Sequence, residues 1–437
     1  MASTADFGSA CSGSNPDTST KQADHSGRLI LFFATFVDMI AVYTITSGLH
    51  DEASVARLSE AFLGSVFPEG DYMMRGADFS DFGTHTLDLI YVRTGGAEGI
   101  FRQLLPGLLA RGAERFLLLT SGRSNSLAAS LEILSFLQQQ GLRGEVLHGS
   151  EEYLRRRIQI LATAAAAREK LRGKRIGVIG APSDWLIASH ADPQALSDKL
   201  GLTLEDIPMV ELLAAIEQAS AEAEPESLTM VRDVHAAWPG ATRIYNALQA
   251  LVTRHGLGAL TLRCFDLLTA VRNTGCLALA RLNAEGIPAS CEGDVPALLS
   301  MMIAQALTGR TGFQANPARI DPDSGEMLFA HCTVPFNLVR DWTLDTHFES
   351  GIGIGIHGEL PEGPVTVFKV SGDLRQHFAA EGTLVRNQYE QHLCRTQAVL
   401  QLSPDDARYF LTRPIGNHHI LIPGHHRALM EEFTACA

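Results

Sequence analysis

The chain has 437 residues, of which 46% are hydrophobic and 19% are charged, and its net charge is −14. This length exceeds what one hydrophobic core usually supports, so we expect roughly three folded domains and little disorder. The acidic balance, without clustered basic residues, excludes the electrostatic signature of nucleic-acid binding. Seven cysteines lie outside any CxxC pair, which argues against a zinc module or a disulfide framework and predicts a cytoplasmic protein.

The N-terminal region contains an apolar stretch, 29–46, that is long enough to resemble a membrane span. Asp38 lies inside this stretch, and the preceding residues carry three Asp and one Lys, unlike a signal or transit peptide. We therefore expect no membrane association. We predict that residues 1–38 are a disordered or non-native extension and that the natural chain starts at Met39, which opens the first strand.

Short β-branched runs alternate with longer helical runs from Tyr43 to about Val146. This alternation is typical of a parallel sheet with crossover helices, and it predicts a first α/β domain over residues 39–150. The expected strands are 42–47, 87–92, 116–120 and 145–148, and the expected helices are 52–63, 100–110 and 127–139.

A second α/β domain is expected over residues 151–309. A helix at 151–171 leads into a strand at 174–180, and a further helix and strand follow near 244–253 and 259–263. The predicted fold class is therefore α/β, with two doubly wound parallel-sheet domains.

After Arg310 the pattern changes, because strand-length segments alternate with turns rich in Gly and Pro. This pattern predicts a β-rich C-terminal domain over residues 310–437, built as an antiparallel barrel or sandwich. The expected strands include 327–333, 351–356, 365–370 and 398–402.

Two loops that follow strands of the second domain carry polar side chains where open α/β sheets place ligands. The first loop, Gly-Ala-Pro-Ser-Asp-Trp, lacks the G-x-G-x-x-G spacing, which excludes a dinucleotide fingerprint. Ser183, Asp184 and Trp185 are candidate ligand contacts, and an ordinary helix-capping loop is an equal alternative. In the second loop, Arg263 could clamp a sugar hydroxyl or a carboxylate, or it could pair internally with Asp266.

Glu292 and Asp294 lie at the start of an apolar helix, within the segment Cys-Glu-Gly-Asp. Nine of the sixteen histidines lie between His331 and the C-terminus, among them His418. A carboxylate with one or two imidazoles is a ligand set for zinc, manganese or iron. The alternative is that Asp294 only caps the helix, Glu292 is solvated and the histidines lie on the surface. Cysteines near these residues suggest a thiolate in the site, although buried free cysteines are the commoner case.

The segments Cys291–Asp294 and Gly416–His418 resemble the metal-binding segments of the L-fucose isomerase family and its L-arabinose isomerase relatives. The resemblance implies two α/β domains followed by a β-rich domain, and assembly as a homo-oligomer, either a trimer or a hexamer. It implies Mn²⁺-dependent interconversion of aldoses and ketoses. It further implies that Glu292, His331 and His418 are metal ligands.

Asn316 departs from the family pattern, because it lies where the family has a second acidic metal ligand. An amide oxygen can still bind the metal, but an amide cannot accept a proton at neutral pH. The resemblance implies an enediolate mechanism with Glu292 as the base, and we assign Asp294 to catalysis beside it. The group that returns the proton is one of four candidates: Asp294, His331, His347 and Glu349.

The stretches 263–266, 347–351 and 393–397 resemble a fucose isomerase-like subgroup whose substrates are poorly defined. We assign seven polar or aromatic residues to substrate binding: Ser183, Asp184, Trp185, Arg263, His347, Glu349 and Arg395.

Two alternative functions stay open. Asn316 could mark a lyase or an epimerase whose sugar-like substrate is acidic or phosphorylated, given the cationic residues Arg263, Lys369 and Arg395. The other alternative is a non-catalytic sugar-binding protein that has lost the second carboxylate.

Overall fold

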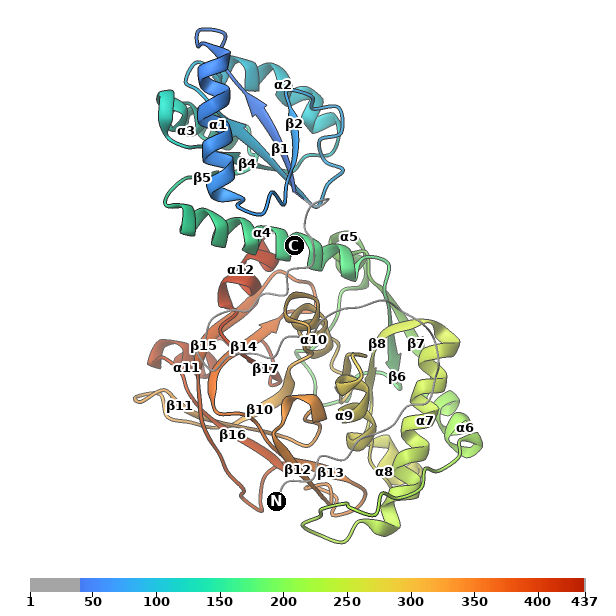
Figure 1. Cartoon of the computed structure of the whole chain (residues 1–437). Coiled ribbons are helices and arrows are strands. Elements are labelled where there is room, and N and C mark those ends of the chain that lie inside the picture. The colour runs from blue at the N-terminus through green and yellow to red at the C-terminus, as the bar shows by residue number, and fades with distance from the viewer. Residues whose placement is uncertain (1–39, 436–437) are drawn as a thin grey trace.

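The computed structural model describes residues 40–435 and contains two parallel sheets flanked by helices, followed by a closed antiparallel barrel (Figure 1). This arrangement confirms the predicted α/β fold class with a β-rich C-terminal part. The predicted N-terminal extension, 1–38, and Met39 lie outside the described residues. No helix within residues 40–435 is both long and apolar enough to span a membrane.

The first sheet has the strand order β2-β1-β3-β4-β5, and all of its neighbouring strands are parallel. Helices α2 and α3 pack on one face, and α1 and α4 pack on the other. Because both faces are covered, the central strands are apolar almost throughout, as in Leu87–Val92. The elements are β1 (Ile40–Ile45), α1 (Glu52–Val66), β2 (Met73–Gly76), β3 (Leu87–Val92), α2 (Glu98–Ala110), β4 (Arg115–Leu119), α3 (Ser126–Gln139), β5 (Arg143–Leu147) and α4 (Glu151–Leu171).

The second sheet is also parallel, with the order β7-β6-β8-β9. Helices α4, α5 and α10 contribute to the core on one face, and α6, α7 and α9 contribute to the core on the other. The elements are β6 (Arg175–Ile179), α5 (Pro193–Leu200), β7 (Thr203–Ile207), α6 (Met209–Gln218), α7 (Trp238–His255), β8 (Leu257–Leu262), α8 (Asp266–Ala270), α9 (Cys276–Ala284), β9 (Ala289–Cys291) and α10 (Val295–Thr308).

The C-terminal part is a closed six-stranded barrel with the order β10-β11-β16-β15-β14-β17, in which β10 pairs with β17. A separate hairpin is formed by β12 and β13. The elements are β10 (Phe313–Ile320), β11 (Glu326–His331), β12 (Asp341–Asp345), β13 (Gly355–Glu359), β14 (Gly363–Val370), β15 (His377–Asn387), β16 (Thr396–Gln401), α11 (Pro404–Thr412), β17 (His419–Pro423) and α12 (Arg427–Ala435).

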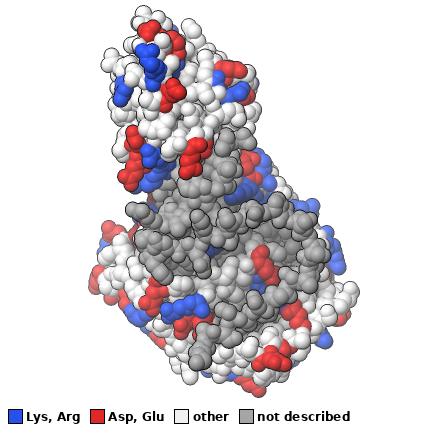
Figure 2. Space-filling model, viewed as in Figure 1, with Lys and Arg blue, Asp and Glu red and all other residues white. Residues whose placement is uncertain are grey.

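Helices α4 and α10 join these parts. The first half of α4 packs on the first sheet through Leu154 and Ile158, and its second half joins the core that α10 shares with the barrel strands β14 and β17. The last helix, α12, contacts α4, where Arg157 pairs with Glu432 at 2.6 Å and with Glu145 at 2.6 Å. Since α4 belongs to two cores, the predicted domain boundary at residue 150 stays a prediction. On the face shown in Figure 2, acidic and basic side chains are interspersed over the described surface.

The strand predicted at 351–356 is wrong over its first half. Gly351 and Gly353 adopt positive φ angles of 66° and 65°, so pairing starts only at Gly355. The edge strands β2 and β7 were not predicted from the sequence. Both are short and only partly buried, so they lack the continuous apolar run that marks the central strands.

Candidate metal and active site

The loop between β9 and α10 carries Glu292 at the carboxyl edge of the second sheet. Glu292 and Gly293 both have left-handed backbones, with φ of 67° and 73°. A Cβ on Gly293 would collide with the carbonyl oxygen of Ala181, so only glycine fits there. The amide N–H of Ser183 donates to the carbonyl oxygen of Glu292 at 2.9 Å, and the N–H of Gly293 donates to that of Leu262 at 3.0 Å. The loop is thus fixed to two neighbouring strand ends, where open α/β sheets bind ligands.

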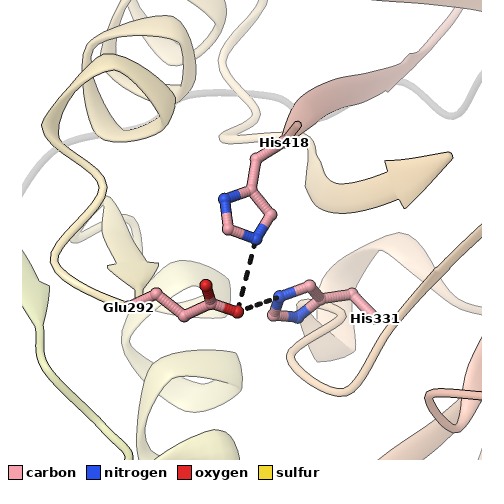
Figure 3. A group of neighbouring side chains, drawn as sticks. All are labelled: Glu292, His331 and His418. Carbon is pink, nitrogen blue, oxygen red and sulfur yellow. Dashed lines mark ion pairs between the residues drawn. The ribbon is translucent and has the colours of Figure 1, made fainter. Parts of the chain in front are cut away.

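Glu292, His331 and His418 converge on one point from three separate segments (Figure 3). His331 ends β11, and His418 immediately precedes β17. The Glu292 Oε1 atom lies 3.5 Å from His418 Nε2 and 4.0 Å from His331 Nε2, and the candidate ligand atoms all lie within 4.8 Å of one another. The structure therefore brings together three of the four residues predicted as metal ligands.

The outer atoms of these three side chains are held by hydrogen bonds. Trp185 Nε1 donates to Glu292 Oε2 at 2.7 Å, while His331 Nδ1 shares a 3.0 Å hydrogen bond with Thr333 Oγ1. His418 Nδ1 lies 2.8 Å from Asp294 Oδ2. These contacts leave the Nε2 atoms facing the centre, and His418 Nε2 is buried without a hydrogen-bond partner within residues 40–435. Such outer-shell bonds and a buried, unused nitrogen fit a divalent metal.

The charges of the cluster are strongly coupled. Burial raises the pKa of Glu292, but His418, His331 and the Trp185 hydrogen bond outweigh it and bring the pKa to about 2. Burial lowers the pKa of His418, but Asp294 and Glu292 outweigh burial and raise it to about 9. Burial and the neighbouring His418 lower the pKa of His331 to about 3. Without a cation, His418 thus carries the positive charge that balances the carboxylates, and a divalent ion would replace its proton.

Aromatic side chains form a wall beside the cluster. The ring of Phe265 lies edge-on to Trp185, with centroids 4.9 Å apart, and to His347, with centroids 5.7 Å apart. Burial and Arg395 lower the pKa of His347 to about 4, so this imidazole is neutral at pH 7. Burial and the charge of Glu292 raise the pKa of Glu349, which places these two groups in the same electrostatic environment.

The remaining predicted site residues have contacts of their own. Arg263 pairs with both Asp184, at 3.0 Å, and Asp266, at 3.1 Å, so the internal pair considered from the sequence is present. Arg395 is buried, and its Nε atom donates to the Thr346 carbonyl oxygen at 2.8 Å. The structure thus ties both arginines to protein groups, and their assignment to substrate binding stays a prediction.

Asn316 lies at the barrel end near His418. Its Oδ1 atom accepts a hydrogen bond from Asn417 Nδ2 at 3.1 Å, and Asn417 immediately precedes His418. Ser183 is buried directly beside the Glu292 loop. These positions keep both residues near the cluster, and their roles as a metal ligand and a substrate contact stay predictions.

Two cysteines that flank the site converge, a question that the sequence left open. The sulfur atoms of Cys264 and Cys291 lie 2.9 Å apart, and both residues are buried free thiols. The hydrogen bond with Cys264 and burial raise the pKa of the Cys291 thiol well above its ordinary value. A protonated, buried thiol is a poor ligand and nucleophile, so this pair fits a structural role better than a thiolate role.

Sequence reasoning missed two residues that hold the site. Thr333 fixes the His331 ring, and its position two residues further along the chain was an available signal, because alternate strand residues share a face. Gln314 Oε1 accepts the N–H of Cys291 at 2.8 Å and thereby ties the barrel strand β10 to the Glu292 loop. This contact joins two distant segments and has no local sequence pattern.

No family model matches the chain. A 231-residue stretch is 29% identical to the sulfoquinovose isomerase of Clostridium sp. (strain MSTE9), covering 50% of this chain and 49% of that protein. The sulfoquinovose isomerase of Alkalicoccus urumqiensis is 25% identical over 216 residues, covering 46% of this chain and 48% of the relative. That of Priestia aryabhattai is 26% identical over 237 residues, covering 51% and 52%.

The matched stretches span about half the length of these curated relatives. The names of the relatives support the relationship to sugar isomerases that the Cys-Glu-Gly-Asp and Gly-Asn-His segments predicted. The assignment to the fucose isomerase-like subgroup stays a prediction.

Proposed function

We propose that this protein is a divalent-metal-dependent aldose–ketose isomerase whose substrate is a sugar of the sulfoquinovose type. The observation that carries the proposal is the convergence of Glu292, His331 and His418, whose ligand atoms lie within 4.8 Å at the edge of a parallel sheet. The relatives supply the sugar class. We propose Mn²⁺ as the metal because one carboxylate and two neutral imidazoles suit it, with the Asn316 amide oxygen as a fourth ligand.

The proposed reaction moves a proton between carbons 1 and 2 of the open-chain sugar. When bound, the cation supplies a Lewis acid that polarises the carbonyl group. Glu292, with a pKa of about 2, is ionised but a weak base, which suits a ligand better than the proton carrier that the sequence suggested. We therefore propose Glu349 and His347 as the proton-transfer groups, because the pKa of Glu349 is raised and His347 is neutral at pH 7.

The same wall would orient the substrate. Trp185 and Phe265 present apolar surface beside the cluster, and sugars bind through the apolar faces of their rings or chains as well as through hydroxyl groups. Trp185 also fixes Glu292 through its indole N–H, so one side chain would link the sugar contact to the metal ligand. Arg263, which lies at the same strand edge, is the proposed contact for the acidic group of the substrate.

The test uses the full-length protein, treated with a chelator and reloaded with MnCl₂. Sulfoquinovose is the main substrate, and glucose, L-fucose and L-arabinose are the comparisons, with products identified by carbon NMR. The expected product is a ketose of unchanged mass, formed from sulfoquinovose and only after metal is added. An epimeric aldose or cleavage products would instead support an epimerase or a lyase, and sugar binding without any product would support a non-catalytic protein.

The variant Glu292→Gln should bind metal weakly and form no ketose while remaining folded. Glu362→Gln is the matched control, because Glu362 is exposed in the turn before β14. Full activity in Glu292→Gln would remove this cluster from the reaction. Loss of activity in both variants would show that the assay reports stability and not the site.

A further inference from the structure

Asp294 is a fully buried carboxylate whose two oxygen atoms serve different partners. Asp294 Oδ1 accepts the N–H of Ala297 at 2.8 Å and so caps the start of α10. Asp294 Oδ2 lies 2.8 Å from His418 Nδ1. A cap needs only one of these oxygens, so the contact with His418 asks for a separate explanation.

Lys369, at the end of β14, supplies the opposite charge. Its Nζ atom is buried, lies 3.6 Å from Asp294 Oδ1, and has no hydrogen-bond partner in the described part of the chain. A buried ammonium is costly unless a carboxylate compensates it, and a buried carboxylate likewise needs a cation. The Lys369 side chain also passes beneath Gly416, in the turn that carries His418. The pair therefore lies directly behind the candidate metal ligand.

We propose that Asp294 and Lys369 are positioning residues for the metal site. Asp294 accepts the N–H of His418 Nδ1, so that Nε2 faces Glu292 Oε1, 3.5 Å away, as the metal-binding atom. Lys369 supplies the charge that keeps the Asp294 carboxylate buried as a pure acceptor. This inference rests on the proposed function only in its metal, not in its sugar, and it replaces the role of Asp294 in proton transfer predicted from the sequence.

The alternative is that Asp294 is only a helix cap. Asp192 provides a direct comparison, because its Oδ1 atom accepts the N–H of Ala195 at 3.0 Å at the start of α5. The same short helix carries Lys199, whose Nζ atom donates to the Asp373 carbonyl oxygen at 3.2 Å. The chain thus offers a second capping aspartate with a nearby lysine, remote from the candidate ligands.

The test is the double variant Asp294→Asn/Lys369→Met, which keeps a capping oxygen and leaves the net charge unchanged. The asparagine must turn its NH₂ group toward His418, and this donor pairs only with an Nδ1 atom that carries no proton. The ring proton then moves to Nε2, where it blocks metal binding. Removing both charges avoids the uncompensated ammonium that Asp294→Asn alone would leave, so the double variant should fold.

Mn²⁺ affinity is measured by calorimetry without sugar, and ligand geometry is read from the visible absorption of the Co²⁺-loaded protein. We expect the double variant to bind Mn²⁺ about 10- to 100-fold more weakly and to show a changed Co²⁺ spectrum. The matched control, Asp192→Asn/Lys199→Met, should keep wild-type affinity and spectrum. Wild-type affinity in the Asp294 double variant would refute the positioning role and leave Asp294 as a cap.

The outcome separates this inference from the proposed function. A wild-type protein that binds Mn²⁺ but converts no sugar would refute the isomerase proposal and leave the positioning role intact. A wild-type protein that binds neither Mn²⁺ nor Co²⁺ would refute the positioning role, whatever its activity. Rescue of metal binding by restoring Asp294 alone, in the Lys369→Met background, would assign the orienting contact to Asp294.

Discussion

Replacing Gly293 by alanine tests how the Glu292 loop is held. Two costs are expected, because Gly293 has a φ of 73° and because a Cβ would meet the backbone of Ala181 and Pro182. Gly309, at the end of α10, separates these costs, since its φ is 78° but the space around a Cβ is open. Gly309→Ala therefore carries only the conformational cost, about 1 kcal/mol.

The difference between the two variants isolates the steric contact. Backbone atoms cannot rotate away as a side chain can, so Gly293→Ala must displace the loop, at an added cost of about 1–3 kcal/mol. We expect Gly293→Ala to lower the free energy of unfolding by about 2–4 kcal/mol in all, measured by urea denaturation. Because Glu292 moves with the loop, Mn²⁺ affinity should fall as well, whereas Gly309→Ala should leave it unchanged. Equal losses of stability in both variants would refute the close packing of the two loops.

Three further predictions follow from the site. Trp185→Phe keeps the ring contact with Phe265 but removes the hydrogen bond to Glu292; because Trp185 is half exposed, we expect a loss of about 1 kcal/mol in Mn²⁺ binding, or roughly fivefold, and an unchanged affinity by calorimetry would contradict it. The raised pKa of His418, about 9 against an ordinary 6.5, stabilises the metal-free protein below pH 6.5, so its unfolding free energy should fall as the pH rises to 9 while Mn²⁺ affinity increases; a flat profile would exclude this histidine. Cys291, whose thiol pKa is raised, should react with iodoacetamide at pH 8 only after unfolding, and rapid labelling of the folded protein in mass spectra would contradict its burial.

The sequence by itself determined the layers of the fold and several of the site residues. Alternating strand and helix periods specify two parallel sheets, because crossover helices must cover both faces, and the change in pattern after Arg310 specifies the β-rich part. The cluster of histidines near the C-terminus, together with Glu292 at a helix start, indicated the candidate ligands that the structure brings together. These signals are local and periodic, so they survive without knowledge of distant contacts.

Only the tertiary structure decided the roles of residues whose partners are far away in the chain. Asp294 reads as an ordinary helix cap until His418, 124 positions later, lies against its second oxygen atom. Lys369 reads as a cation for an acidic substrate until its burial beside Asp294 turns it into a counter-charge. Hydrogen bonds and ion pairs between distant segments depend on the packing of α10 against the barrel, and no local propensity or spacing encodes that packing.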